Sequence, residues 1–298
     1  MLNHTKGIIY ASITAFFWGF LAIALKVAVQ EIDPGTIVWF RFVIAFSFLA
    51  GWHIIKKPQE LRILYKPPLL LVLAALGLSW NYMGFMLGIH YTTPSNAQMF
   101  IQTGPLTLAV VGITVFKEKI GKYQVIGFLL AIIGLAFFYS QQINAFIGTE
   151  EKYNYGVLFT VSGALAWTLY ASLQKKLVVK YPVNTLNLFI FGLPILIYLP
   201  FIDVAPLFKL SWEWWLLIFF LGANTLIAYT CMAAALKYTH ANKVSIIIFL
   251  NPLITFVTMG ILTYMNISWI EGEHFTFLSI VGALTLLAGA IMVVKNGK

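Results

Sequence analysis

The chain has 298 residues, of which 60% are apolar, 16% aromatic and 10% charged, and its formal net charge is +9. Soluble domains average roughly 45–50% apolar and about 25% charged residues, so this composition excludes an ordinary soluble protein and predicts an all-α integral membrane protein. The single cysteine, Cys231, excludes an intrachain disulfide and a cysteine-based metal site, and we expect neither a metal nor a cofactor.

Nine windows without charged residues, and a tenth whose only charged residue is Arg41, predict ten transmembrane helices. Each can supply about 17–25 residues, enough to cross a hydrocarbon core about 30 Å thick as a helix. The first window lacks a small-residue cleavage site, so we expect it to be retained and not removed as a signal peptide. The windows are 8–25, 36–55, 69–89, 94–116, 123–147, 153–174, 183–202, 214–236, 244–270 and 275–294.

The distribution of basic residues predicts that both termini are cytoplasmic. With the N-terminus inside, most of the 19 lysines and arginines fall in cytoplasmic segments, and only Lys26, Lys152 and Lys209 fall outside. This bias is the positive-inside rule, and it fits a bacterial inner membrane. The net charge is therefore a topology signal that favours membrane lipid, and not nucleic acid, as the partner.

The second half of the chain repeats the first. We assign residues 1–145 and 153–298 to two five-helix repeats; since five is odd, the second copy must insert upside down. Inverted repeats are typical of secondary transporters, in which two halves give alternating access to a site near the midplane. The pairs that carry the repeat are Trp18 with Trp167, Lys26 with Lys175, Tyr91-Thr92 with Tyr238-Thr239, Pro105 with Pro252, and Glu118 with Glu273.

Two tryptophans occupy equivalent mid-span positions. Trp18 and Trp167 lie some ten residues into their spans, away from the interfaces where tryptophan usually gathers. One interpretation is a buried indole whose N–H finds a carbonyl. The other is a pair of cavity walls, to which Tyr170 adds a hydroxyl. For Lys26 and Lys175, near span ends, we expect snorkelling to the headgroups.

Arg41 is the only full charge deep within a window. An arginine at the bilayer centre costs roughly 2.5–3.5 kcal/mol on insertion scales, so it must face protein, water or a headgroup. Snorkelling or a contact with Glu31 or Asp33 is one interpretation. A vestibule that receives anionic groups of a substrate is the other.

Asparagines stand on stripes of small residues in the third and eighth spans. Gly77, Asn81, Gly84 and Gly88 share one side of a helix, which predicts close helix packing. The equivalent stripe of the eighth span carries Asn224. A buried amide needs a partner from another helix or from cargo, so Asn81 and Asn224 are candidate binding residues.

The fourth span is the most polar. Gln98 and Gln102 share a face, and because two amides facing lipid would be costly we expect them to line a cavity. Ser245 lies on the equivalent face of the ninth span.

Mid-helix prolines in the fourth and ninth spans predict kinks. Pro105, after Gly104, and Pro252 remove the hydrogen bonds to the carbonyls of Ile101 and Ile248. Symmetric kinks suggest hinges, with a purely structural bend as the alternative.

Glu118 and Glu273 stand just before the last span of each half. A carboxylate suits a helix N-terminus, so we expect both to anchor the helices they precede. Those two spans are almost uniformly apolar and contain glycines. They are expected to be peripheral struts or the surface of a homodimer.

Taken together, these features resemble the EamA-type branch of the drug/metabolite transporter superfamily, over essentially the whole chain. The resemblance implies export or exchange of small metabolites through a central cavity bounded by the first four spans of each half. Arg41 departs from the repeat, because Ile190 stands at its counterpart. The residues that carry the likeness are Phe17-Trp18-Gly19, Pro34 followed by Arg41, Tyr91-Thr92 leading to Pro105 and Glu118, and Tyr238-Thr239 leading to Pro252.

The predicted function is a secondary transporter that exports or exchanges small neutral or zwitterionic metabolites, such as amino acids or amphipathic compounds. An antiporter of organophosphates or nucleotide sugars is an alternative of the same fold, although Arg41 alone gives it thin support. Outside carriers, a channel or an intramembrane enzyme are the alternatives. No nucleophile, metal cluster or carboxylate pair indicates an enzyme. No Asp or Glu falls in a span core, so we expect facilitated diffusion or exchange without obligatory proton coupling.

Overall fold

The computed structural model describes residues 3–92, 94–138, 151–203, 205–270, 272 and 276–296, and these residues form helices and no strands. The helices follow the apolar windows, and capping side chains fix some of their starts. Asp33, for example, accepts a hydrogen bond from the Thr36 N–H at the start of the second helix. The elements are α1 His4–Ala28, α2 Pro34–Lys56, η1 Pro58–Leu64, α3 Leu69–Tyr91, α4 Pro94–Ile101, α5 Thr103–Thr114, α6 Lys122–Phe138, α8 Glu151–Leu177, α9 Val183–Tyr198, η2 Leu199–Phe201, η3 Pro206–Lys209, α10 Trp212–Tyr238, α11 Ala241–Ile248, α12 Asn251–Tyr264 and α13 Phe277–Asn296.

Eight stretches of the described chain are long and apolar enough to cross a membrane. Two of them, Asn96–Thr114 and Ala241–Tyr264, each contain two helix segments in succession. The helices α6 and α13 are apolar but count as shorter, over Lys122–Phe137 and Phe277–Gly289. An integral membrane protein therefore fits the structure. Part of the fifth predicted window and the start of the tenth lie outside the described residues.

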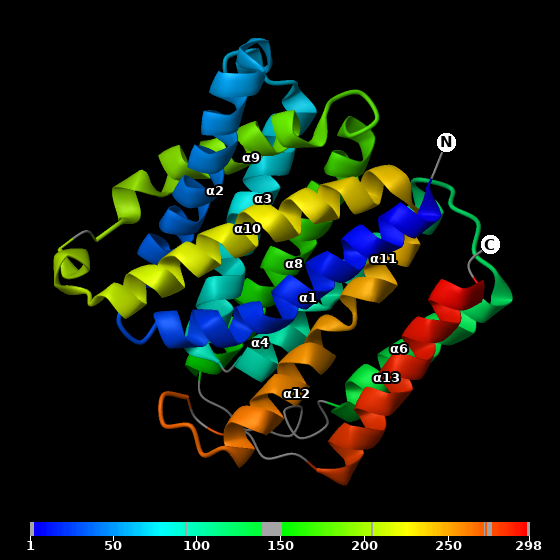
Figure 1. Ribbon diagram of the computed structural model, residues 1–298. Coiled ribbons are helices and arrows are strands. Elements are labelled where there is room, and N and C mark those ends of the chain that lie inside the picture. Colours follow the sequence, from blue (N-terminus) through cyan, green and yellow to red (C-terminus); the bar gives the residue numbers. More distant parts are fainter. Residues whose placement is uncertain are drawn as a thin grey trace.

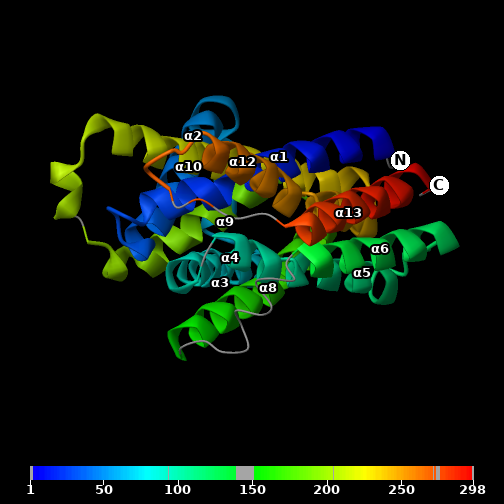
Figure 2. The ribbon, with the colours of Figure 1, turned by 90° about the horizontal axis from the view of Figure 1, so that it is seen from below.

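Helices from the two halves of the chain alternate in the bundle. In Figure 1, α1 and α10 run side by side, α3 packs on α8, and α2 lies against α9 and α10. Helices α1 and α8 are the first spans of the two halves, and α3 and α10 are the third spans. In both pairs, α3 with α8 and α10 with α1, the third span of one half packs on the first span of the other. Figure 2 shows α6 and α13 side by side at one edge of the bundle, and it places both chain termini at the same end.

Glycines bring the helices of different halves into close contact, as their stripes predict. A Cβ added at Gly84 of α3 would lie 2.5 Å from the Phe159 carbonyl oxygen and 3.1 Å from the Gly163 Cα of α8. A Cβ at Gly134 of α6 would lie 2.4 Å from the Leu286 nitrogen of α13. The glycines of α6 and α13 thus pack within one chain, and a homodimer through these helices stays a prediction.

The fourth and ninth spans are each interrupted where their prolines predict. Helix α4 ends at Ile101 and α5 begins at Thr103; α11 ends at Ile248 and α12 begins at Asn251. Because Pro105 and Pro252 have no N–H to donate, the carbonyls of Ile101 and Ile248 lose their helical partners. The structure therefore interrupts each span near the predicted kink, at Gln102 in the fourth span and at Phe249 and Leu250 in the ninth, while the backbone of these residues stays in the right-handed helical region.

Candidate functional site

A cavity of about 60 Å³ lies in the centre of the bundle, between helices of both halves. A single water needs about 10–15 Å³ of such space, so the cavity admits only a small group in this conformation. Both helix breaks reach it, through Ile101 and Pro105 on one side and Ile248 and Asn251 on the other. It is lined by Trp18, Leu21, Arg41, Asn81, Tyr82, Phe85, Gln98, Ile101, Gln102, Pro105, Trp167, Tyr229, Ile248 and Asn251.

Aromatic rings form one wall of the cavity. The ring centroids of Trp18 and Trp167 are 5.9 Å apart in an edge-to-face arrangement, and Trp18 lies 5.0 Å from Tyr229. Neither indole N–H has a hydrogen-bond partner among the described residues. The interpretation in which each indole N–H binds a carbonyl is therefore wrong for this conformation. The structure instead brings the two tryptophans together beside the cavity.

Side-chain amides form the polar part of the lining. The Gln98 amide donates to the Trp18 carbonyl at 3.4 Å and to the Thr255 hydroxyl at 3.3 Å. Asn81 donates to the Gly163 carbonyl at 3.1 Å and accepts from the Tyr229 hydroxyl at 3.3 Å. By contrast, Gln102 Oε1 is buried and has no partner in the described part of the chain. Gln98 and Asn81 therefore hold helices together at the cavity, whereas Gln102 keeps an acceptor unused.

Arg41 faces this cavity and is only 2% exposed. Its Nε donates to the Thr225 hydroxyl at 3.2 Å, and its guanidinium carbon lies 4.2 Å from the centre of the Tyr82 ring. The Tyr82 hydroxyl donates to the same Thr225 hydroxyl at 3.1 Å. The predictions of snorkelling and of a contact with Glu31 or Asp33 are wrong, since a buried arginine in mid-bundle finds polar neighbours on α3 and α10 instead.

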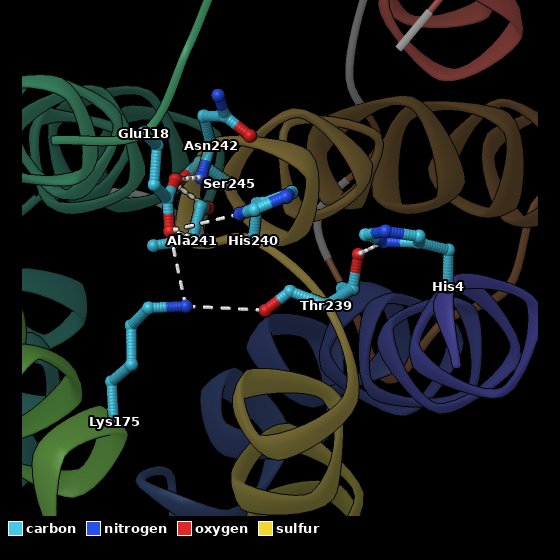
Figure 3. A network of polar contacts seen from close by, with 8 residues as sticks. All are labelled: His4, Glu118, Lys175, Thr239, His240, Ala241, Asn242 and Ser245. Atoms are coloured by element: carbon cyan, nitrogen blue, oxygen red, sulfur yellow. Dashed lines mark hydrogen bonds and ion pairs between the residues drawn. The ribbon is translucent and has the colours of Figure 1, made fainter. Parts of the chain in front are cut away.

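A second polar site, the Glu118 cluster, consists of Glu118, Lys175, Thr239, His240, Ala241 and Asn242 (Figure 3). The Glu118 carboxylate accepts hydrogen bonds from the backbone N–H groups of Ala241, at 2.8 Å, and Asn242, at 3.1 Å. The Lys175 ammonium lies 3.0 Å from Glu118 Oε1 and donates to the Thr239 carbonyl at 3.1 Å. The cluster therefore joins the end of α5, the end of α8 and the junction of α10 with α11.

This cluster corrects two predictions. Glu118 does not anchor the helix it precedes but caps α11 of the other half, because the N-terminus of a helix attracts a carboxylate. Lys117, at φ 54°, turns the chain so that the Glu118 N–H donates to the Gly112 carbonyl. Lys175 does not snorkel, since Glu118 offers it an ion pair. Glu273, the repeat counterpart of Glu118, lies outside the described residues.

The electrostatics of the cluster favour an ionised Glu118. Burial alone would raise the pKa of Glu118, but Lys175 and the two backbone N–H donors outweigh burial and lower the pKa from its ordinary value of 4.5. Burial lowers the pKa of His240 from 6.5, and Glu118 offsets this only in part. At neutral pH the 3.7 Å contact between His240 and Glu118 is therefore no ion pair.

Comparison with known proteins places the chain in a family. Residues 5–140 and 154–295 each match the EamA-like transporter family. The chain belongs to this family. An uncharacterized transporter of Haemophilus influenzae is 33% identical over 96% of this chain and 94% of its own length, and the uncharacterized inner membrane transporter YhbE of Escherichia coli K12 is 31% identical over 96% and 90%. A solved crystal structure aligns over 98% of both chains with a TM-score of 0.77 at 15% identity, which supports the fold alone.

Three residues predicted to bind substrate lie away from the cavity of this EamA-family protein. Tyr170 is fully buried against Tyr229, with ring centroids 5.7 Å apart, and it is Tyr229 that lines the cavity. Asn224, five residues before Tyr229 and so on another face, donates to the Phe17 carbonyl at 2.7 Å. Ser245 donates to the Ala241 carbonyl at 2.8 Å and lies beside the Glu118 cluster (Figure 3). Helix α11, which carries Ser245, ends at Ile248, so the face of Ser245 does not continue into α12.

The three residues predicted as hinges differ in their surroundings. Pro105 lines the cavity, whereas Pro252 is buried and does not. The Gly104 carbonyl accepts a hydrogen bond from the Thr168 hydroxyl at 3.0 Å, and a Cβ at Gly104 would lie 3.0 Å from the Trp167 ring. Gly104 thus allows the close approach of α5 to α8, where a Cβ would be tightly placed.

Sequence reasoning missed Tyr82, Tyr229 and Asn251 as cavity residues. Asn251 had a signal, because it stands directly before Pro252 as Gly104 stands before Pro105. Tyr82 adjoins Asn81, but the 100° between successive helical residues gives no reason to place both at one cavity. Tyr229 sits among apolar residues and small residues and had no signal of its own.

Proposed function

We propose that this EamA-family transporter is a secondary carrier that exports or exchanges small neutral or zwitterionic metabolites, such as amino acids, by alternating access through the central cavity. The observation that carries the proposal is a central cavity whose walls come from both halves and whose polar groups are incompletely bonded. The indole N–H groups of Trp18 and Trp167 and the Gln102 Oε1 lack partners among the described residues. A cargo molecule supplies them.

The proposed carrier consists of two inverted five-helix repeats, residues 1–145 and 153–298, with both termini in the cytoplasm of a bacterial cell. The two family matches fall within these ranges, both chain ends lie at one end of the bundle (Figure 2), and an E. coli relative is named an inner membrane transporter. Inverted repeats give alternating access because each half can adopt the conformation of the other.

Movement in the proposed cycle occurs at the helix breaks. The breaks before Pro105 and Pro252 leave backbone groups without helical partners at the cavity, which is where broken helices of transporters bind cargo and bend. The Glu118 cluster closes the path at one end, because it joins α5 of the first half to α11 of the second. Opening that end requires Glu118 to release α11 or Lys175.

The proposed transport is facilitated diffusion or exchange. Proton-coupled carriers use a carboxylate or histidine within the membrane, and the described lining of the cavity contains neither. Uphill accumulation in proteoliposomes that collapses with the pH gradient would refute this part of the proposal. Flux that fails to saturate with substrate would instead indicate a channel.

The test of the carrier is a metabolite-wide comparison of efflux from cells with and without the protein. It is repeated with Gln102→Ala and Trp167→Ala, which change the cavity, and with Trp212→Ala, which removes a tryptophan that is 68% exposed. We expect a defined set of metabolites whose efflux the cavity variants reduce and the control does not. An unchanged metabolite profile in the cells that make the protein would overturn the proposal.

A further inference from the structure

Among the residues that the structure describes, the lining of the central cavity contains one full charge, that of Arg41, and no carboxylate. No acidic residue contacts the guanidinium in the part of the chain that the structure describes, and none lines the cavity. At 2% exposure the group is largely removed from water. A buried cation without an anion is unfavourable, because desolvation is not offset by an opposite charge. The carrier proposed above therefore has a binding site that is electrostatically incomplete.

The neighbours of Arg41 orient its guanidinium and leave its charge uncompensated. Thr225 accepts from Nε at 3.2 Å, and the ring of Tyr82 covers one face of the group. Tyr82 is in turn fixed by its own hydrogen bond to Thr225, at 3.1 Å. With Nε engaged, the terminal nitrogens are the groups that bind an anion. A planar guanidinium can donate two parallel hydrogen bonds to the two oxygens of a carboxylate. A guanidinium whose plane is held in place therefore favours a carboxylate as its ligand.

We propose that Arg41 is the residue that binds the carboxylate of the cargo, and that the cargo is a small organic acid, including amino acids. This rests on the proposed carrier function. It narrows the zwitterionic cargo to molecules with a carboxylate, and it extends the cargo class to small organic acids with one negative charge. One cation in a small cavity matches one negative charge, because no lysine and no second arginine lines the cavity in the described chain. A phosphate ester would need further cations. The aromatic rings of Trp18 and Trp167 accept the apolar part of the molecule.

The binding test uses purified protein and pairs of acids with their neutral amides. The probes are lactate and lactamide, 3-phenylpropanoate and 3-phenylpropanamide, together with L-alanine, L-phenylalanine and inorganic phosphate. We expect at least one acid to raise the thermal midpoint of the wild type, its amide to have little effect, and Arg41→Gln to abolish the shift. Arg41→Lys keeps the positive charge but lacks the two parallel donors of a guanidinium, so the acid should raise its thermal midpoint by less. Thr225→Val removes the hydrogen bond that holds the guanidinium plane, so the acid should raise its midpoint by less as well.

Three results would overturn the role of Arg41. In the first, an amide raises the thermal midpoint of the protein as much as its acid does. In the second, an acid still raises the midpoint of Arg41→Gln. In the third, phosphate raises the midpoint of the wild type and none of the acids does. A panel in which no acid stabilises the wild type also counts against the proposal. Arg41→Gln is itself checked for folding by its midpoint without ligand.

Efflux measured with the same variants separates this inference from the carrier function. We expect Arg41→Gln to lower the efflux of carboxylate cargo by about 30-fold or more, as for the loss of one partner of a buried charge pair. Cargo that leaves Arg41→Gln cells at the wild-type rate would overturn the role of Arg41 and leave the carrier standing. If the wild type exports nothing, the carrier fails, while an acid-dependent midpoint shift that needs Arg41 still supports the site.

Discussion

Glu118 and Arg41 are both buried charges that join the two halves of the molecule, yet their surroundings differ. Glu118 has a cation and two backbone N–H donors, all supplied by the chain. Arg41 has a hydroxyl and an aromatic face, which orient it but carry no opposite charge. A charge whose partners are complete holds helices together. A charge whose partners are incomplete is available to a ligand.

The largest effect that tests this comparison is expected from Glu118→Ala. The change removes the cap of α11 and leaves Lys175 without its anion, and breaking a buried pair in this way costs about 3–5 kcal/mol. The measurement is the thermal unfolding midpoint of the purified protein, with Glu213→Ala, an exposed glutamate, as the matched control. A midpoint equal to that of the wild type would show that the Glu118 cluster does not hold the halves together.

A smaller effect is expected from Lys175→Met. Glu118 would keep its two backbone hydrogen bonds, so the loss should be about 1.5–3 kcal/mol, the contribution of one hydrogen bond to a charged group. The control is Lys26→Met, its counterpart in the repeat, for which the described chain records no ion pair; a change within about 0.5 kcal/mol is expected there. Equal losses in the two variants would mean that the ion pair contributes nothing beyond the packing of a long side chain.

Acidification should weaken the Glu118 cluster gradually. Because the pKa of Glu118 is lowered from 4.5 in the folded protein, its contribution to stability is complete above pH 4.5 and is lost as the pH falls through the folded pKa. The thermal midpoint of the wild type should therefore approach that of Glu118→Gln as the pH falls below 4.5. If the difference between the two proteins stays constant over that range, the ionised carboxylate is not the stabilising form.

The same contrast explains what could be predicted from the sequence. Pro105 and Pro252 act on carbonyls four residues back, so the breaks at Ile101 and Ile248 follow from local chemistry. The backbone N–H groups that Glu118 caps are more than a hundred residues away in the other half, and no local rule selects them over the helix that Glu118 precedes. Arg41 was recognisable as a costly charge, but its neighbours Tyr82 and Thr225 depend on how α2 packs against α3 and α10.

Tyr170, Asn224 and Ser245 show a related limit. Helical periodicity shows which residues share a face within one helix. It does not show which face borders the cavity, because the cavity lies where several helices meet. The break after Ile248 and the packing of Tyr229 in front of Tyr170 decide which of these faces the cavity reaches.

The smallest effect is expected from Arg41→Gln without cargo, and this result most sharply separates the two charges. The variant loses the bond to Thr225 and the contact with Tyr82. It also removes a buried charge that has no anion beside it in the described part of the chain, so the two changes oppose each other. The thermal midpoint should stay near or above that of the wild type, although Arg41 is as buried as a core residue. A loss as large as that of Glu118→Ala would show that Arg41 is structural, because only a charge already compensated within the protein is so costly to remove.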